Sequence, residues 1–186
     1  MNKLIILPVL LLFISCATDK KQSIKTTMIA KVETTKTKTT TILKNVVTIT
    51  DKAYILQFKI EKTKNKHNLV IDIKLQKGAS FISPFEEKEF SGKFYMDLGD
   101  YTNLSFDKKI IETPQAVAEF DGFKKGSVIW VKENTTYIQS LNIKSDEDFE
   151  VFGRVQFTIE PRCTFEEIPF ALSYSNGVFT FIDPKC

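Results

Sequence analysis

Apolar and polar residues alternate with a period of two along most of this chain. The segment YILQFKI places Tyr54, Leu56, Phe58 and Ile60 on one face, and LVIDIKL repeats the pattern from Leu69. A period of two is that of a β-strand with one buried face, whereas a helix needs a period near 3.6. Both segments are therefore predicted to be strands.

Further strand-sized runs continue to the end of the chain: SVIWV, TYIQSLNI, FEVFGRVQFTI, IPFALSY and VFTFI. Gly153 in the third run predicts a β-bulge, and SNG between the last two predicts a hairpin turn. A helical pattern is missing, because KKIIETPQAVAEF is interrupted by Pro114. Many short strands at close spacing predict an all-β fold, a sandwich of antiparallel sheets.

The first sixteen residues, MNKLIILPVLLLFISC, indicate the compartment. Lys3 precedes an apolar run from Leu4 to Ile14, and Ser15 and Cys16 follow. The run is shorter than the roughly 20 residues that span a bilayer, so it predicts a secretory signal. Its end resembles a bacterial lipoprotein signal, in which the cysteine is lipidated and becomes the new N-terminus. We expect a signal peptide at 1–15 and a lipid anchor on Cys16; the alternative is a plain cleaved signal.

The next segment differs from the rest in charge. Residues 17–50 hold seven lysines against two acidic residues, whereas residues 51–186 hold 18 basic and 21 acidic ones. We expect a flexible Thr/Lys-rich tether at 16–40 and a β-sandwich domain at 41–186, with ILKNVVTIT as its first strand. The tether is either solvated or rests on anionic headgroups near the anchor. The protein is thus placed in the bacterial cell envelope, facing the periplasm or the exterior.

The composition indicates a well-packed body. The chain has 16 phenylalanines and only 7 glycines and 6 prolines. This aromatic content excludes a disordered body, and the domain is long enough to bury a core without metals. We expect Trp130 and most phenylalanines to be buried.

Residue constellations that carry catalysis are missing. The single histidine, His67, lies in the lysine-rich segment KTKNKHN, typical of an exposed hairpin loop. A Ser-His-Asp or Cys-His arrangement would have to use it, and zinc sites need several His and Cys ligands. The acidic clusters at 86–89 and 146–148 lack the spacing of a calcium loop and are interpreted as solvated. We predict no catalytic residue, metal or cofactor, and no nucleic acid partner for an exported, net-acidic body.

Cys163 lies between two strand-like runs, in FTIEPRCTFEEIPF. If Tyr174 and Val178 flank the SNG turn, paired residue numbers sum to about 352 and Cys186 falls beside Cys163. In an oxidising compartment this juxtaposition predicts a structural disulfide between Cys163 and Cys186, worth on the order of 3 kcal/mol. The alternatives are a redox-active bond, with a thiolate favoured by Arg162, and two thiols.

From about Asn68 to Phe181 the chain resembles the N-terminal periplasmic domain of the DsbD family of thiol:disulfide interchange proteins. The resemblance rests on the order of LVIDIKLQKGASFISP, ETPQAVAEF and FEVFGRVQFTIEPRC. It implies an immunoglobulin-like sandwich in which a cysteine pair takes electrons from a partner domain and passes them to periplasmic proteins. Cys163 matches the first cysteine, but Ile168 and Pro169 stand where the second would be. One thiol cannot make the usual intradomain switch.

Three function classes follow. The first is a lipid-anchored, non-catalytic sandwich that binds or scaffolds an envelope protein through loops or a strand edge. The second is a thiol-disulfide exchange accessory that uses Cys163 and Cys186. The third is a lipocalin-like carrier, whose aromatic residues would line a cavity for an apolar ligand.

Overall fold

The chain folds into antiparallel β-strands, as its periodicity predicts. The computed structural model describes residues 38–43, 45–64, 66–123 and 125–184, and within them there is no helix that could cross a membrane. The predicted signal peptide at 1–15, the lipidation site Cys16, most of the tether and Cys186 lie outside the described residues.

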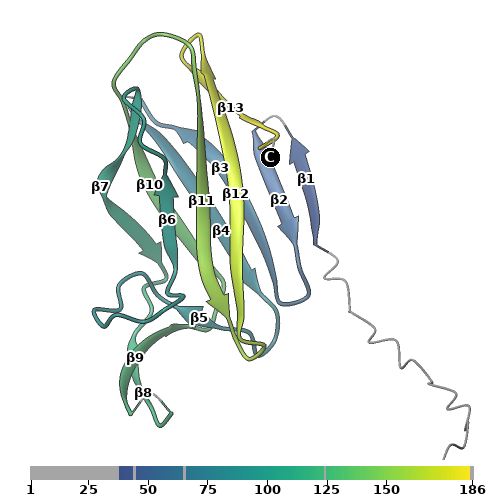
Figure 1. Cartoon of the computed structure of the whole chain (residues 1–186), viewed down its shortest axis with the longest axis vertical. Coiled ribbons are helices and arrows are strands. Elements are labelled where there is room, and N and C mark those ends of the chain that lie inside the picture. The colour runs from purple at the N-terminus through teal and green to yellow at the C-terminus, as the bar shows by residue number, and fades with distance from the viewer. Residues whose placement is uncertain (1–37, 44, 65, 124, 185–186) are drawn as a thin grey trace, which may run out of the picture. The chain divides into compact units, whose positions relative to one another are not determined.

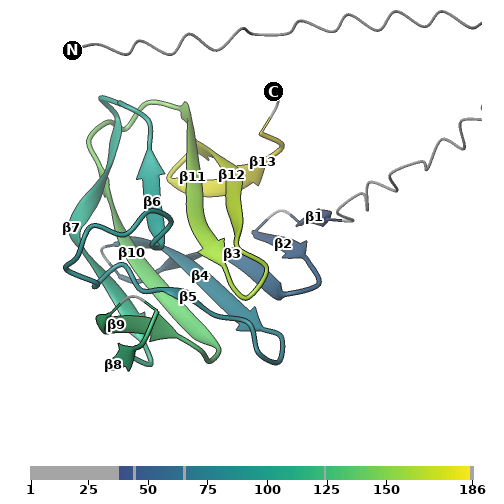
Figure 2. The same cartoon turned by 60° about the horizontal axis from the view of Figure 1, so that its bottom comes forward.

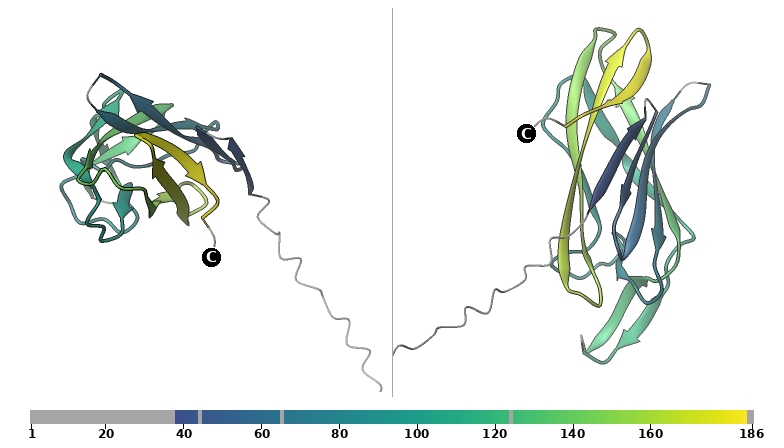
Figure 3. Two further views of the ribbon diagram at one scale, coloured as in Figure 1. Left: turned by 90° about the horizontal axis from the view of Figure 1, so that it is seen from above. Right: turned by 90° about the vertical axis from the view of Figure 1, so that its right-hand side faces the viewer.

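Two large sheets form the two layers of the sandwich (Figure 1). The six-stranded sheet has the order β1 (Thr39–Leu43), β2 (Val46–Thr50), β3 (Tyr54–Lys62), β4 (His67–Leu75), β10 (Thr135–Ile143) and β7 (Leu104–Thr113). The four-stranded sheet has the order β13 (Val178–Ile182), β12 (Thr164–Ser175), β11 (Phe149–Ile159) and β6 (Tyr95–Leu98). All pairs are antiparallel, and the right-hand view of Figure 3 shows the layers edge-on.

Aromatic side chains fill the space between the layers. Tyr54 of β3 meets Phe157 of β11 edge to face, with ring centroids 5.3 Å apart, and Phe58 of β3 lies 5.1 Å from Phe170 of β12. All four side chains are buried, as the alternation in their strands predicts. The fold is an all-β sandwich consistent with an immunoglobulin-like architecture, and both sheets keep open edges rather than closing into a lipocalin-type barrel.

A small third sheet lies at one end of the sandwich (Figure 2). It consists of β5 (Phe81–Ile82), β9 (Gly126–Val131) and β8 (Ala118–Asp121), with β9 in the centre. An antiparallel bridge between Ser80 and Glu160 ties it to the turn that joins β11 to β12. From this end the β8–β9 hairpin projects away from the two layers.

Two local predictions are corrected by the strand pairing. ILKNVVTIT is not one strand: β1 and β2 form a hairpin in which Leu43 pairs with Val46. Gly153 is not a bulge, because β11 and β12 pair without interruption from Phe149–Tyr174 to Ile159–Thr164. The irregularity lies instead between β10 and β7, at Gln139 to Leu141.

The predicted register of the last hairpin is wrong by one residue. Asn176 and Gly177 have φ values of 51° and 75°, and Ser175 pairs with Val178. Two central residues with positive φ make a two-residue hairpin loop of the Asn-Gly kind. Ile182 consequently lies opposite Ala171 rather than Phe170.

The expected burial of the aromatic residues is only partly correct. Trp130 is half-buried, and among the described residues four phenylalanines are exposed: Phe120, Phe123, Phe152 and Phe165. Composition predicts how much apolar area is present, but it cannot show which strands face solvent. Phe120, Phe123 and Phe152 belong to two surfaces that are described below.

Gly153 tests the packing between the sheets. A Cβ at this position would lie 2.4 Å from the Cζ atom of Phe170 and 2.7 Å from the backbone oxygen of Asp97. Gly153→Ala is expected to lower the free energy of unfolding by about 1–3 kcal/mol, since a packed core resists added atoms. Urea denaturation measures the effect, and Gly122→Ala is the matched control, because no atom beyond its two chain neighbours lies within 4 Å of its Cβ position. Equal stability of the two variants would contradict this packing.

Candidate functional site

The end of the sandwich that carries the small sheet also holds Cys163 and an ion cluster. Arg162 Nη1 donates to Asp51 Oδ1 at 2.7 Å, and Arg162 Nη2 donates to Glu166 Oε1 at 2.6 Å. The Tyr54 hydroxyl donates to Glu166 Oε2 at 2.9 Å, and Lys38 Nζ lies 3.4 Å from the same oxygen. The cluster joins the turn before β3 to the start of β12.

The electrostatics of this cluster favour its charged form. Burial raises the pKa of Asp51, but the Ala53 N–H and the Arg162 guanidinium outweigh burial and hold that pKa below its usual value. Burial and the Glu166 carboxylate raise the pKa of Tyr54, so its hydroxyl stays a donor. Asp51 and Tyr54 therefore do not exchange protons near neutral pH. The hydrogen bonds and ion pairs of the cluster have a structural role.

Cys163 occupies the turn between β11 and β12 with a φ of 50°, and it is exposed. Its Sγ atom lies 3.0 Å from Glu160 Oε2 and 3.8 Å from the carbonyl oxygen of Pro161. The Arg162 guanidinium points to Asp51 and Glu166 instead. The predicted activation of the thiol by Arg162 therefore has no support in this geometry.

The predicted disulfide between Cys163 and Cys186 requires the end of β13 to lie beside the turn that carries Cys163. Ile182, the last residue of β13, lies opposite Ala171, whereas Cys163 lies beyond the far end of β12. Seven residue steps along β12 cover about 23 Å, and the four residues that follow Ile182 can span at most about 14 Å. The pairing stays a prediction, since Cys186 lies outside the described residues, but the reach of the chain disfavours it.

His67 opens β4 and lines a surface hollow of about 400 Å³ at the opposite end of β4 from the ion cluster. Its ring packs against the rings of Phe179 and Tyr174, at centroid distances of 5.2 and 6.4 Å. Burial, and then the nearby charge of Lys62, lower its pKa, so the ring is neutral at pH 7.

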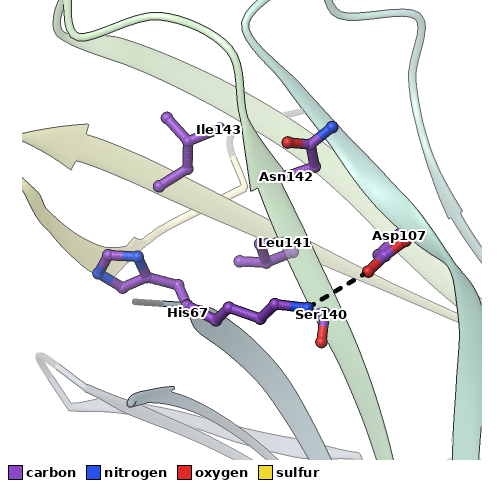
Figure 4. A pocket seen from close by; sticks show the side chains of 7 residues that line it. His67, Asp107, Ser140, Leu141, Asn142 and Ile143 are labelled. Atoms are coloured by element: carbon purple, nitrogen blue, oxygen red, sulfur yellow. Dashed lines mark ion pairs between the residues drawn. The ribbon is translucent and has the colours of Figure 1, made fainter. Parts of the chain in front are cut away.

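Figure 4 shows the other side chains of this hollow, including the ion pair of Lys66 Nζ with Asp107 Oδ2 at 3.7 Å. Across the described part of the chain, no three His, Cys, Asp or Glu side chains gather in a way that would hold a metal ion. His67 has the contacts of a packing residue, and this hollow gives no support to catalysis.

Buried carboxylates hold the small sheet in place by accepting hydrogen bonds. The alternation of apolar residues in the sequence did not predict that these carboxylates are buried. Glu112 Oε2 accepts hydrogen bonds from Ser83 Oγ and from the Tyr137 hydroxyl, both at 2.8 Å, and its Oε1 accepts from the Ala116 N–H at 2.9 Å. A buried carboxylate needs such donors, so Glu112 fixes the loops on both sides of the small sheet to β10.

Glu86 supports the same sheet, although the sequence predicted a solvated loop. It is 6% exposed, and its two oxygens accept from the N–H groups of Lys88 at 3.0 Å and Ile129 at 2.8 Å. Trp130 Nε1 donates to Asp121 Oδ2 at 3.0 Å, which ties β9 to β8. The projecting hairpin is therefore anchored by hydrogen bonds along its length.

The hairpin carries exposed apolar side chains from the start of β8 to its turn, which we together call the apolar tip. Val117, Phe120 and Phe123 are 79%, 77% and 101% exposed. Asp121 Oδ1 accepts from the Phe123 N–H at 2.8 Å, so the turn that carries this ring is held in place. The sequence signal was present in VAEFDGF, where large apolar residues stand in a turn-rich segment.

Comparisons with known proteins leave the family open. No known family model matches the sequence, and no curated protein shows a significant match. The GAE domain of GGA2p from Saccharomyces cerevisiae is similar with a TM-score of 0.38 and 10% identity, over 74% of this chain and 99% of that domain. The reduced DsbD N-terminal domain of Neisseria meningitidis is similar with a TM-score of 0.39 and 12% identity, over 71% of this chain and 92% of that one. Scores below 0.5 transfer no activity.

Arg162→Ala tests the ion cluster. The change leaves two buried carboxylates without their guanidinium, and we expect a loss of about 3 kcal/mol in unfolding free energy, near the lower end for a broken buried pair. Arg154→Ala is the control: its side chain is 48% exposed, and we expect a loss within about 1 kcal/mol.

The pH dependence of this difference follows from the lowered pKa of Asp51. A carboxyl with a lowered pKa stabilises the fold above its ordinary value of 3.8, and the stabilisation is lost as the pH falls through the folded-state pKa. Urea unfolding should show a constant gap between wild type and Arg162→Ala from pH 5 to 8, narrowing below about pH 4. A gap that widens in acid would contradict the proposed charges.

Proposed function

We propose that this chain is a lipid-anchored, non-catalytic β-sandwich of the bacterial cell envelope that binds an envelope protein through the apolar tip. The observation that carries the proposal is the exposure of Val117, Phe120 and Phe123 on one anchored hairpin. Large apolar side chains gathered on a surface are typical of interaction sites, and aromatic residues supply most of the energy at such sites. The compartment rests on the lipoprotein-like signal that ends at Cys16.

The rigidity of the hairpin supports this function. Trp130, Asp121 and Glu86 fix its strands by hydrogen bonds, so little conformational freedom remains to be lost when the tip is buried. A convex tip of this kind fits an apolar groove on a partner protein. Glu119 of its β8 strand pairs with Lys132, and two lysines follow Phe123 in the sequence, so charge is balanced on the hairpin and the apolar side chains supply the contact.

Thiol-disulfide exchange is the second candidate. It is favoured by the exposure of Cys163 on the same end of the sandwich as the apolar tip, where a bound protein would approach it. With no second cysteine at Ile168 or Pro169, the Cys163 thiolate would attack a disulfide of the partner, which forms a mixed disulfide and releases the partner's other sulfur as a thiolate. Non-reducing peptide mapping, together with a redox titration against a thioredoxin-like protein, separates this role from a structural one.

Photo-crosslinking tests the binding surface. A photoreactive amino acid at position 123 is expected to give a discrete adduct in intact cells, and Phe120→Ser is expected to weaken it by about tenfold, as expected for an aromatic anchor. The control is the same label at position 178, where Val178 is 55% exposed in the four-stranded sheet. Equal adducts from positions 123 and 178 would count against the apolar tip.

Cys16→Ser tests the anchor. Without a lipidated cysteine the mature chain should leave the membrane fraction, because acyl chains supply about 0.8 kcal/mol per buried CH₂ group. Intact-mass measurement of the wild-type chain should show acylation on a new N-terminal Cys16. A soluble wild-type chain that begins at another residue would refute the anchor without affecting the apolar tip.

A further inference from the structure

A second surface lies on the outer face of the four-stranded sheet, where β6, β11 and β12 run side by side (Figure 1). A shallow hollow of about 360 Å³ opens there, which we call the outer groove. Its lining combines two aromatic rings with charged side chains and small residues: Asp97, Gly99, Tyr101, Phe152, Gly153, Arg154, Glu167 and Pro169.

Two aromatic residues of the outer groove, Phe152 and Tyr101, are linked through backbone contacts. Phe152 is 43% exposed, and its N–H donates to the hydroxyl of Tyr101 at 2.9 Å. A Cβ atom on Gly99 would lie 3.1 Å from Cε2 of Tyr101, so the tyrosine ring packs directly against the glycine backbone. Tyr101 is thus fixed beside the backbone of Phe152, whose ring is open to solvent.

The polar part of the groove offers donors and acceptors together. Arg154 Nη2 lies 3.7 Å from Asp97 Oδ2, and Arg154 Nη1 lies 3.7 Å from Glu167 Oε2. These separations exceed hydrogen-bond length, and Glu167 Oε2 accepts from Gln156 Nε2, so the guanidinium, the Asp97 carboxylate and Glu167 Oε1 keep bonding capacity for a ligand. Each of the three side chains is about a third to a half exposed, at 48%, 36% and 52%.

We propose that the outer groove binds a neutral oligosaccharide of β-linked glucose or N-acetylglucosamine units. A pyranose ring of this type presents C–H groups on its faces, which pack on the negative face of an aromatic ring, and hydroxyl groups around its edge. Each hydroxyl both donates and accepts, so a sugar edge satisfies Arg154, Asp97 and Glu167 at once. Apolar walls with a few placed polar groups are the usual make-up of a small-ligand site.

The charges of the groove disfavour an anionic ligand, because it holds two carboxylates and one guanidinium. Arg154 lies 3.7 Å from each of these carboxylates and takes the position that a ligand cation would need. A second hollow, of about 230 Å³, lies on the other side of Phe152 and is lined by Glu150, Ile182 and Asp183 as well. Phe152 therefore stands between two hollows, an arrangement that suits consecutive rings of one chain.

The experiment uses the folded chain with two named probes, the β-1,4-linked tetramers of N-acetylglucosamine and of glucose. Isothermal titration is expected to show binding to at least one of them with a dissociation constant between micromolar and millimolar, and little dependence on salt. Phe152→Ser and Arg154→Ala are each expected to weaken binding about tenfold, equivalent to 1.4 kcal/mol. Phe165→Ser is the matched control, because Phe165 is 55% exposed on the same face but outside the groove, and it should bind as wild type does.

Three results would overturn the proposal: no binding of either tetramer at millimolar concentration, equal binding by Phe152→Ser and wild type, or equal weakening by Phe165→Ser. Binding of a lysine-rich peptide that is lost with rising salt, in place of sugar binding, would show a protein-docking surface instead. Circular dichroism of each variant excludes unfolding as the cause. The apolar tip is not altered in these variants, so this result is separate from that of the crosslinking experiment.

Discussion

The structure depends on the contact of aromatic rings between its two layers. Tyr54 and Phe58 of β3 meet Phe157 and Phe170 of the opposite sheet, and all four are buried. Burying side chains of this size contributes about 1.5–3 kcal/mol each to the free energy of unfolding. These four rings therefore supply a large part of the stabilisation between the two sheets. The packing of Phe170 in this core also requires glycine at position 153, because a side chain there would overlap its ring.

Two buried tyrosines connect this core to buried carboxylates by hydrogen bonds. The ring of Tyr54 packs between the two sheets, and its hydroxyl donates to Glu166. The ring of Tyr137 stacks on Phe94 with centroids 4.1 Å apart, and its hydroxyl donates to Glu112. Each hydroxyl thereby satisfies a carboxylate that burial would otherwise destabilise. The ion cluster and the small sheet are thus fixed to the same core, which lets the small sheet hold a projecting hairpin in one orientation.

The same residue type serves opposite purposes in different places. Phe58 and Phe157 stabilise the core, whereas Phe123 and Phe152 lie in contact with water on the hairpin and on the outer sheet face. Exposed rings contribute little to the free energy of folding, and they lower the solubility of a protein. Such rings are typical of sites that a partner or ligand covers. The hairpin presents a convex apolar surface, and the outer groove presents a shallow surface of mixed polarity.

The sequence by itself determined the fold class and the buried faces of the long strands. Alternation through Tyr54, Leu56 and Phe58 admits only a strand with one face in a core, because the side-chain period is a local property of the backbone. The tertiary structure alone decided which residues pair across strands and which side chains are covered. Register depends on whether Ser175 or Tyr174 faces Val178, and the burial of Glu112 and the exposure of Phe123 depend on which distant segments pack against them. Such contacts join residues far apart in the chain, and no local pattern of polarity encodes them.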